Sequence, residues 1–171
     1  MNEKELLTKK MILVGMNDAK ISTEDKPIIG TEALATCLGV LLYSEEKKVA
    51  IVAHVSSEPI IALDKLFNLI IDNKLLRIPF KYKIFLGYDI KPAEYYQVVE
   101  VLEKHFKDFI QFDDNEIPDY AVNIDEKTQS KEFAFDASVG KFVTDKVLFG
   151  IDYLMINNEE YRDDTNGVRC R

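Results

Sequence analysis

Residues 38–55 read LGVLLYSEEKKVAIVAHV, and this stretch decides the fold. It holds two apolar runs, 38–43 and 49–55, which are separated by five polar residues at 44–48. Apolar runs of this length, bounded by a turn, predict buried strands. Two such strands joined by a short polar turn favour antiparallel pairing. We therefore expect a buried β-hairpin over residues 38–55.

Weaker strand and helix signals extend outward from this hairpin in both directions. Upstream, residues 11–14 predict a short strand, and residues 18–29 predict a second short strand and a turn. Downstream, apolar residues at helical spacing predict helices over about 59–74 and 94–109, each with a proline near its start. Further strands are expected at 82–86, 120–124, 132–136 and 141–144. This order predicts an α+β fold, a layered α/β sandwich of mainly antiparallel strands flanked by two main helices.

Composition and charge narrow the class of protein. The chain has 171 residues, 47% of them hydrophobic and 30% charged, which predicts a single packed domain and not a disordered chain. A net charge of −8 disfavours nucleic-acid binding because phosphate backbones are themselves negative. We expect no membrane insertion, since no apolar run approaches the ~20 residues of a membrane helix. The N-terminal residues lack the pattern of a secretory signal, so the expected location is cytoplasmic.

The chain offers few residues for a metal or a disulfide. It contains two histidines and two cysteines, and neither cysteine belongs to a CxxC pair, so no metal or cofactor is expected. Cys170 lies one residue from the C-terminus, where order is not expected. A structural disulfide between Cys170 and Cys37 is therefore not predicted.

Cys37 and His54 are the candidates for chemistry. Cys37 lies where a predicted turn of small residues, 30–36, gives way to the first hairpin strand, and His54 lies near the end of the second. The hairpin brings the two positions close together, and an imidazole beside a thiol can accept its proton. The plainer alternative is also open: a buried cysteine is often a small hydrophobe, and a histidine between Ala53 and Val55 is often a core residue.

The segment GTEALATCLGVLLY at 30–43, with VAHV at 52–55, resembles the signature of the chemoreceptor glutamine deamidase (CheD) family. That family has a threonine six residues before its cysteine, a strand that ends in Leu-Tyr and an Ala-His dipeptide on the next strand. Thr31 lies six residues before Cys37, and the spacing from Cys37 to His54 agrees as well. Weaker similarities follow in the family's order at 14–22, 83–87 and 130–143. The resemblance predicts a deamidase domain over 11–147, a frayed N-terminus over 1–10 and a C-terminal extension of unknown role over 148–171.

The resemblance implies a protein-glutamine deamidase that hydrolyses a glutamine side chain to glutamate and ammonia. Cys37 would be the nucleophile, His54 would hold it as a thiolate and move protons, and Thr31 would orient His54. Backbone N–H groups around Thr36 and Cys37 would stabilise the oxyanion. The substrate would be a protein that bears a glutamine, first of all a chemoreceptor, and a CheC-like phosphatase is a possible partner.

The chain departs from the family just before its cysteine, where Ala35-Thr36 replaces Gly-Ser. A turn that needs a positive φ at this position would be strained by alanine. The loop after His54 is also shorter than in the family. Two alternatives follow: a catalytically inactive CheD-like protein-binding regulator, or an effector-like deamidase that acts on a protein outside chemotaxis.

Overall fold

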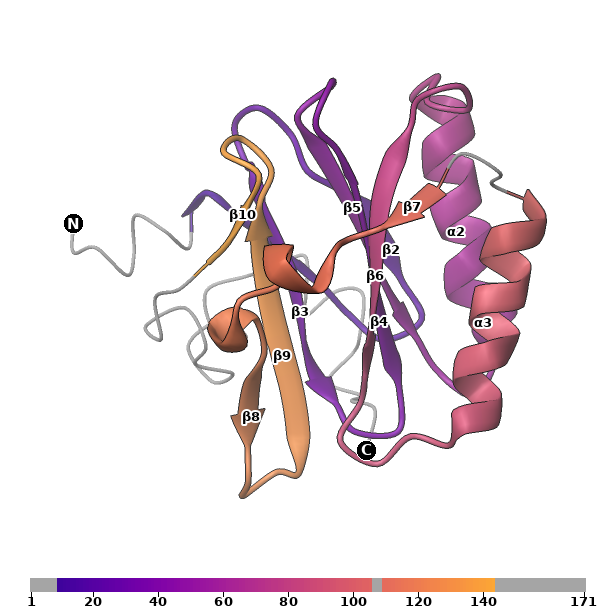
Figure 1. Cartoon of the computed structure of the whole chain (residues 1–171), viewed down its shortest axis with the longest axis vertical. Coiled ribbons are helices and arrows are strands. Elements are labelled where there is room, and N and C mark those ends of the chain that lie inside the picture. The colour runs from indigo at the N-terminus through magenta and orange to yellow at the C-terminus, as the bar shows by residue number, and fades with distance from the viewer. Residues whose placement is uncertain (1–8, 106–108, 144–171) are drawn as a thin grey trace.

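Two five-stranded β-sheets stack face to face, and two helices cover the outer face of one of them (Figure 1). This computed structural model describes residues 9–105 and 109–143. The predicted α+β layered sandwich of mostly antiparallel strands is therefore confirmed. Residues 1–8 and 144–171 lie outside the described part, and with them most of the predicted frayed N-terminus and all of the C-terminal extension.

The first sheet, sheet A, has the strand order β1-β3-β9-β10, with β8 paired to β9. β1 and β3 are parallel, and the other pairs are antiparallel. Its strands are β1 (Met11–Val14), β3 (Ile28–Leu34), β8 (Asn123–Asp125), β9 (Ser130–Asp136) and β10 (Lys141–Phe142).

The second sheet, sheet B, has the order β2-β5-β4-β6-β7, with only β6 and β7 parallel. Its strands are β2 (Ala19–Ile21), β4 (Leu38–Ser44), β5 (Val49–Val55), β6 (Phe80–Leu86) and β7 (Phe109–Gln111). The predicted hairpin is confirmed as β4 and β5, which pair from Leu38↔Val55 to Ser44↔Val49 around a turn at 45–48. This hairpin lies at the centre of sheet B because β2 and β6 pair with its two outer edges.

The helices α2 (Pro59–Asp72) and α3 (Pro92–His105) lie side by side on the outer face of sheet B (Figure 1). Prolines begin both helices, where the missing N–H costs no intrahelical bond. Helical spacing places one buried stripe of α2 against the sheet, together with Val98 and Leu102 of α3. Glu58 is the N-terminal residue that flanks α2, and its side chain makes no capping hydrogen bond.

Three local predictions were wrong, and in each case long-range pairing overrode the local pattern. The small residues after Gly30 are not a turn, because β3 continues to Leu34 and pairs with β1 and β9. The second helix ends at His105, and residues 109–111 join sheet B beside β6. The predicted strand 120–124 is divided between the short 3₁₀ turn η2 (Asp119–Ala121) and β8, and another 3₁₀ turn, η1 (Asp114–Glu116), precedes them.

The core between the sheets is built from alternate residues of each strand. Ile29 and Phe133 of sheet A face Leu41 and Val52 of sheet B across this interface. Gly39 makes the approach possible, since a Cβ there would lie 2.6 Å from a ring carbon of Phe133. No described helix is long and apolar enough to cross a membrane.

Candidate active site

Thr31, Cys37 and His54 come from three different parts of the sandwich. Thr31 lies in β3 of sheet A, His54 lies near the end of β5 of sheet B, and Cys37 lies in the bend at 35–37 that connects the sheets. Their exposed fractions are 1%, 0% and 2% for Thr31, Cys37 and His54, respectively. The candidate site is thus in the interior, at the end of the hairpin opposite its turn.

The register of the hairpin places Cys37 and His54 on the same face of sheet B. His54 pairs directly with Gly39, and Cys37 precedes Gly39 by two residues. Residues two apart on an extended chain point to the same side, so Cys37 is the diagonal neighbour of His54. Cys37 also belongs to the core cluster between the sheets, with Val52, which shares the face of His54. The two side chains therefore face the same interior, as the sequence predicts.

A hydrogen bond across the two sheets holds the His54 ring. Thr31 Oγ1 lies 2.8 Å from His54 Nδ1 and donates its own proton to the Val14 carbonyl oxygen at 2.7 Å. A hydroxyl has one proton, so with this proton directed to Val14 the oxygen must accept at its other contact. His54 then carries its proton on Nδ1, and its Nε2 is left with a lone pair.

His54 Nε2 is buried and has no hydrogen-bond partner. Burial also lowers the pKa of His54 from 6.5 to about 4, because the interior disfavours the charged ring. His54 is therefore neutral at pH 7, and its unprotonated nitrogen, Nε2, makes no hydrogen bond. This is the protonation state of a general base. A thiolate at Cys37 would favour the charged ring, because opposite charges at close range stabilise each other.

Cys37 is disulfide-bonded in this structure. This finding contradicts the prediction that Cys37 makes no disulfide. The chain's other cysteine is Cys170, which lies outside the described residues. A sulfur in a disulfide is not a nucleophile, so any thiol chemistry at Cys37 requires the reduced protein.

The bend before Cys37 is held by the end of β6. The amide of Asp89 donates to the carbonyl oxygen of Ala35 at 2.9 Å, and the amide of Tyr88 donates to that of Leu34 at 3.0 Å. Gly87 lies so close that a Cβ would be 2.4 Å from the Cys37 carbonyl oxygen. No pattern in the sequence connected Gly87 with the site. Its one signal was its position directly after β6, the strand that follows the hairpin.

The backbone strain lies two residues before the position expected from the family pattern. Ala35 is not among the described residues with positive φ, whereas Ala33 has a φ of 59°. Ala33 lies in a β-bulge, since Thr31 pairs with Phe133 but Leu34 pairs with Lys131. The extra residue turns both Thr31 and Leu34 toward the core. Thr36, the other proposed oxyanion residue, is exposed beside the buried Cys37.

The loop between β1 and β2 anchors the backbone of His54. Asn17 donates its amide to the His54 carbonyl oxygen at 2.9 Å, and the His54 amide donates to the carbonyl oxygen of Asp18, also at 2.9 Å. The Asn17 side chain accepts a 2.5 Å hydrogen bond from Ser56. Both backbone groups of His54 are thus used at this edge, which keeps its ring directed toward Thr31.

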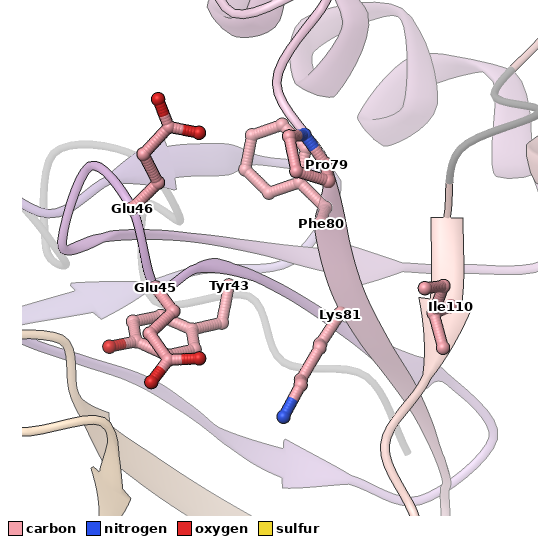
Figure 2. Close-up of a pocket in the computed structure, with 7 residues that line it drawn as sticks. All are labelled: Tyr43, Glu45, Glu46, Pro79, Phe80, Lys81 and Ile110. Atoms are coloured by element: carbon pink, nitrogen blue, oxygen red, sulfur yellow. The ribbon is translucent and has the colours of Figure 1, made fainter.

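A surface hollow at the other end of the hairpin carries no comparable chemistry. It is lined by the seven residues that Figure 2 labels: Tyr43, Glu45, Glu46, Pro79, Phe80, Lys81 and Ile110. Lys81 is already paired with Glu116 at 2.5 Å.

Within 9–105 and 109–143, no group of three histidine, cysteine or acidic residues could hold a metal ion. A comparison with protein-family models and one with curated proteins found no match to this chain.

Proposed function

We propose that this chain is a protein-glutamine deamidase of the CheD type, with Cys37 as nucleophile and His54 as its base. The observation that carries the proposal is the hydrogen bond that His54 Nδ1 donates to Thr31 Oγ1. It holds the ring with its Nδ1 protonated and leaves Nε2 as a base on the face that Cys37 shares. These are the three residues to which the resemblance assigns catalytic roles.

The proposed reaction begins with the reduced thiol. His54 Nε2 accepts the proton of Cys37, and the sulfur attacks the carbonyl carbon of a glutamine side chain. The resulting oxyanion collapses to a thioester while His54 protonates the departing ammonia. Water then attacks the thioester and gives its proton to His54, and the C–S bond breaks to leave glutamate and the free thiol. The sum is glutamine plus water to glutamate plus ammonia.

Thr31 acts in this scheme as a positioning residue. It fixes the tautomer and the orientation of His54 without contact with the substrate. The substrate is a protein glutamine in an exposed segment, with a chemoreceptor helix as the first candidate, and the protein would act in the cytoplasm. A CheC-like phosphatase is the first binding partner to test.

Burial of the site favours a second candidate, a CheD-like binding protein without activity. Cys37 and His54 are almost inaccessible, at 0% and 2%, and a glutamine side chain needs an opening to reach them. The bend at 35–37, in which Thr36 is exposed, is where such an opening would form. The two candidates differ in whether reduced Cys37 reacts.

The deciding experiment measures the rate of Cys37 alkylation by iodoacetamide against pH in a Cys170→Ser background under reductant. An ordinary thiol titrates near ~8.5, and a thiol beside a base reacts well below that pH. We expect His54→Ala to abolish the reactivity at low pH. His105→Ala, which removes the chain's other histidine, is the matched control and should leave it unchanged.

The companion assay follows the mass change from amide to acid and the release of ammonia with a chemoreceptor cytoplasmic fragment. We expect turnover by the Cys170→Ser protein and none after a further Cys37→Ala change. If reduced Cys37 is inert at all pH values, or reacts equally without His54, the binding protein is the better description.

A further inference from the structure

The outer edge of β6 is paired along only part of its length. β7 pairs with Phe80, Lys81 and Tyr82, and the next residue, Phe112, donates its amide to the Tyr82 carbonyl oxygen at 3.0 Å. Beyond that point the chain leaves β6 and continues to η1 (Figure 1). Within 9–105 and 109–143, no strand pairs with the outer edge of residues 83–86.

Strand geometry shows which backbone groups this open edge presents. Along a strand, the N–H and C=O groups of alternate residues point to the same edge. Tyr82 directs its carbonyl oxygen to the outer edge, so Ile84 and Leu86 direct their backbone groups there as well. Lys83 and Phe85 direct theirs to β4. A sheet edge of this kind can add one more strand from another chain.

A surface hollow, which we call the β6 edge groove, follows this open edge. It has a volume of about 420 Å³ and is lined by residues 83–86, so side chains from both faces of β6 contribute to it. Tyr95 of α3 also lines it, as do Val122 and Ile124 at the start of β8. Leu86 is 40% exposed and Ile124 is 50% exposed. The groove therefore offers apolar contacts to the side chains of an added strand.

The charge of the β6 edge groove is opposite to that of the whole chain. Its lining includes Lys83 and Lys131 but only one acid, Asp119, whereas the chain has a net charge of −8. Within the part of the chain that the structure describes, neither lysine makes an ion pair. A segment that carries a carboxylate would complement the two lysines.

The β6 edge groove ends beside the bend that holds Cys37. Leu86 pairs with Leu38, the residue after Cys37, and Lys131 pairs with Leu34, the residue before the bend. An added strand would lie two strand spacings of about 4.8 Å from β4. A residue of that strand which continues past Leu86 therefore lies about 10 Å from the bend.

We propose that the β6 edge groove binds the substrate as an extended segment, which adds a strand to β6 and carries an acidic residue near its glutamine. This inference rests on the proposed function. Lys83 lies three residues before Leu86, about 10 Å along the strand, so the acidic residue is about three to five residues from the glutamine. A receptor helix would have to unwind locally to bind here, because its backbone groups are already paired.

The test measures binding of a synthetic peptide to the Cys37→Ala, Cys170→Ser protein, which has no thiol and so cannot turn the peptide over. The probe is the fluorescently labelled peptide TEVTVQVTVET. It carries a glutamate four residues from the glutamine on each side, so either strand direction presents one to Lys83. We expect saturable binding in fluorescence anisotropy.

Amide exchange read by NMR locates the bound peptide. In the free protein, the amides of Ile84 and Leu86 should exchange faster than those of Lys83 and Phe85, which face β4. In the saturated complex, the Ile84 and Leu86 amides should exchange at least about tenfold more slowly. Protection of β4 and β5 in the same data shows whether each variant is folded.

Charge reversal tests the two lysines. Lys83→Glu and Lys131→Glu should each weaken binding at least about threefold, because attraction is replaced by repulsion. Lys104→Glu, the same change at an exposed position late in α3, is the matched control and should leave binding unchanged. The peptide TKVTVQVTVKT should bind the double variant more tightly than it binds the protein with both lysines.

Absence of saturable binding would overturn the inference, and so would binding that leaves the Ile84 and Leu86 amides unprotected. Equal binding of both peptides by folded charge-reversed variants would also overturn it. An inert Cys37 in the alkylation assay rejects the proposed function, whereas absent peptide binding rejects this inference alone. The two failures are therefore distinguishable.

Discussion

Glu132→Gln should change how the stability of this protein depends on pH. Burial raises the pKa of Glu132 from 4.5 to about 7, so the folded state keeps a proton that the unfolded state loses. The stability that this proton contributes is fully present below pH 4.5 and is lost as the pH rises through 7. One pKa unit corresponds to about 1.36 kcal/mol, so the shift amounts to about 3 kcal/mol.

His54 acts in the opposite direction over nearly the same window. Burial lowers its pKa from 6.5 to about 4, so its contribution is present above pH 6.5 and is lost as the pH falls through 4. Its size is also about 3 kcal/mol. In the unmodified chain the two contributions largely compensate each other, and Glu132→Gln leaves the His54 contribution alone.

The assay is urea unfolding under reductant at intervals from pH 4.5 to 8. We expect the free energy of unfolding of Glu132→Gln, minus that of the unmodified chain, to increase by about 3 kcal/mol across this range. Glu103→Gln removes a carboxylate from the exposed side of α3 and is the control. A difference that changes by less than about 1 kcal/mol would refute the reasoning, because Glu132 would then be solvated or paired in the folded protein.

Three further substitutions test the site and its scaffold. Thr31→Val should leave His54 Nδ1 and a buried carbonyl oxygen unpaired, which costs about 1–3 kcal/mol in urea unfolding and removes the low-pH reactivity of Cys37. If the rate of Cys37 alkylation against pH is unchanged in this variant, Thr31 does not position His54. Ala33→Gly should stabilise the protein by up to about 1 kcal/mol in thermal unfolding, because its φ of 59° suits glycine, and a loss would contradict the strained bulge. Gly39→Ala should cost about 1–3 kcal/mol by crowding Phe133, and a neutral result would mean that the sheets separate easily.

The parts of the fold that the sequence predicted well are those that form between neighbouring segments. The hairpin at 38–55 needs only two adjacent apolar runs and a polar turn, and both α2 and α3 begin at a proline with an apolar stripe behind it. The boundaries that failed depend on distant partners. Residues 31–34 are strand because β9, about a hundred residues later, pairs with them, and no local pattern carries that information.

The candidate site was only partly predictable for the same reason. Spacing and the hairpin were enough to place Cys37 and His54 on one face, as the register now shows. The hydrogen bond between His54 and Thr31 joins two different sheets, so it required the packing of the whole sandwich. The disulfide at Cys37 and the anchoring of its bend by Gly87 also depend on contacts between segments far apart in the chain.

The sequence by itself determined the class of fold and the central hairpin, because these follow from local periodicity and short spacings. It also proposed Cys37 and His54 from their spacing, and Thr31 from the resemblance. Only the tertiary structure decided the protonation and the hydrogen bonds of His54 and Thr31. It buried His54 and so made the ring neutral, directed Thr31 toward Nδ1, and left Nε2 without a partner. Burial and cross-sheet hydrogen bonds are properties of packed layers, and a linear pattern of residues does not contain them.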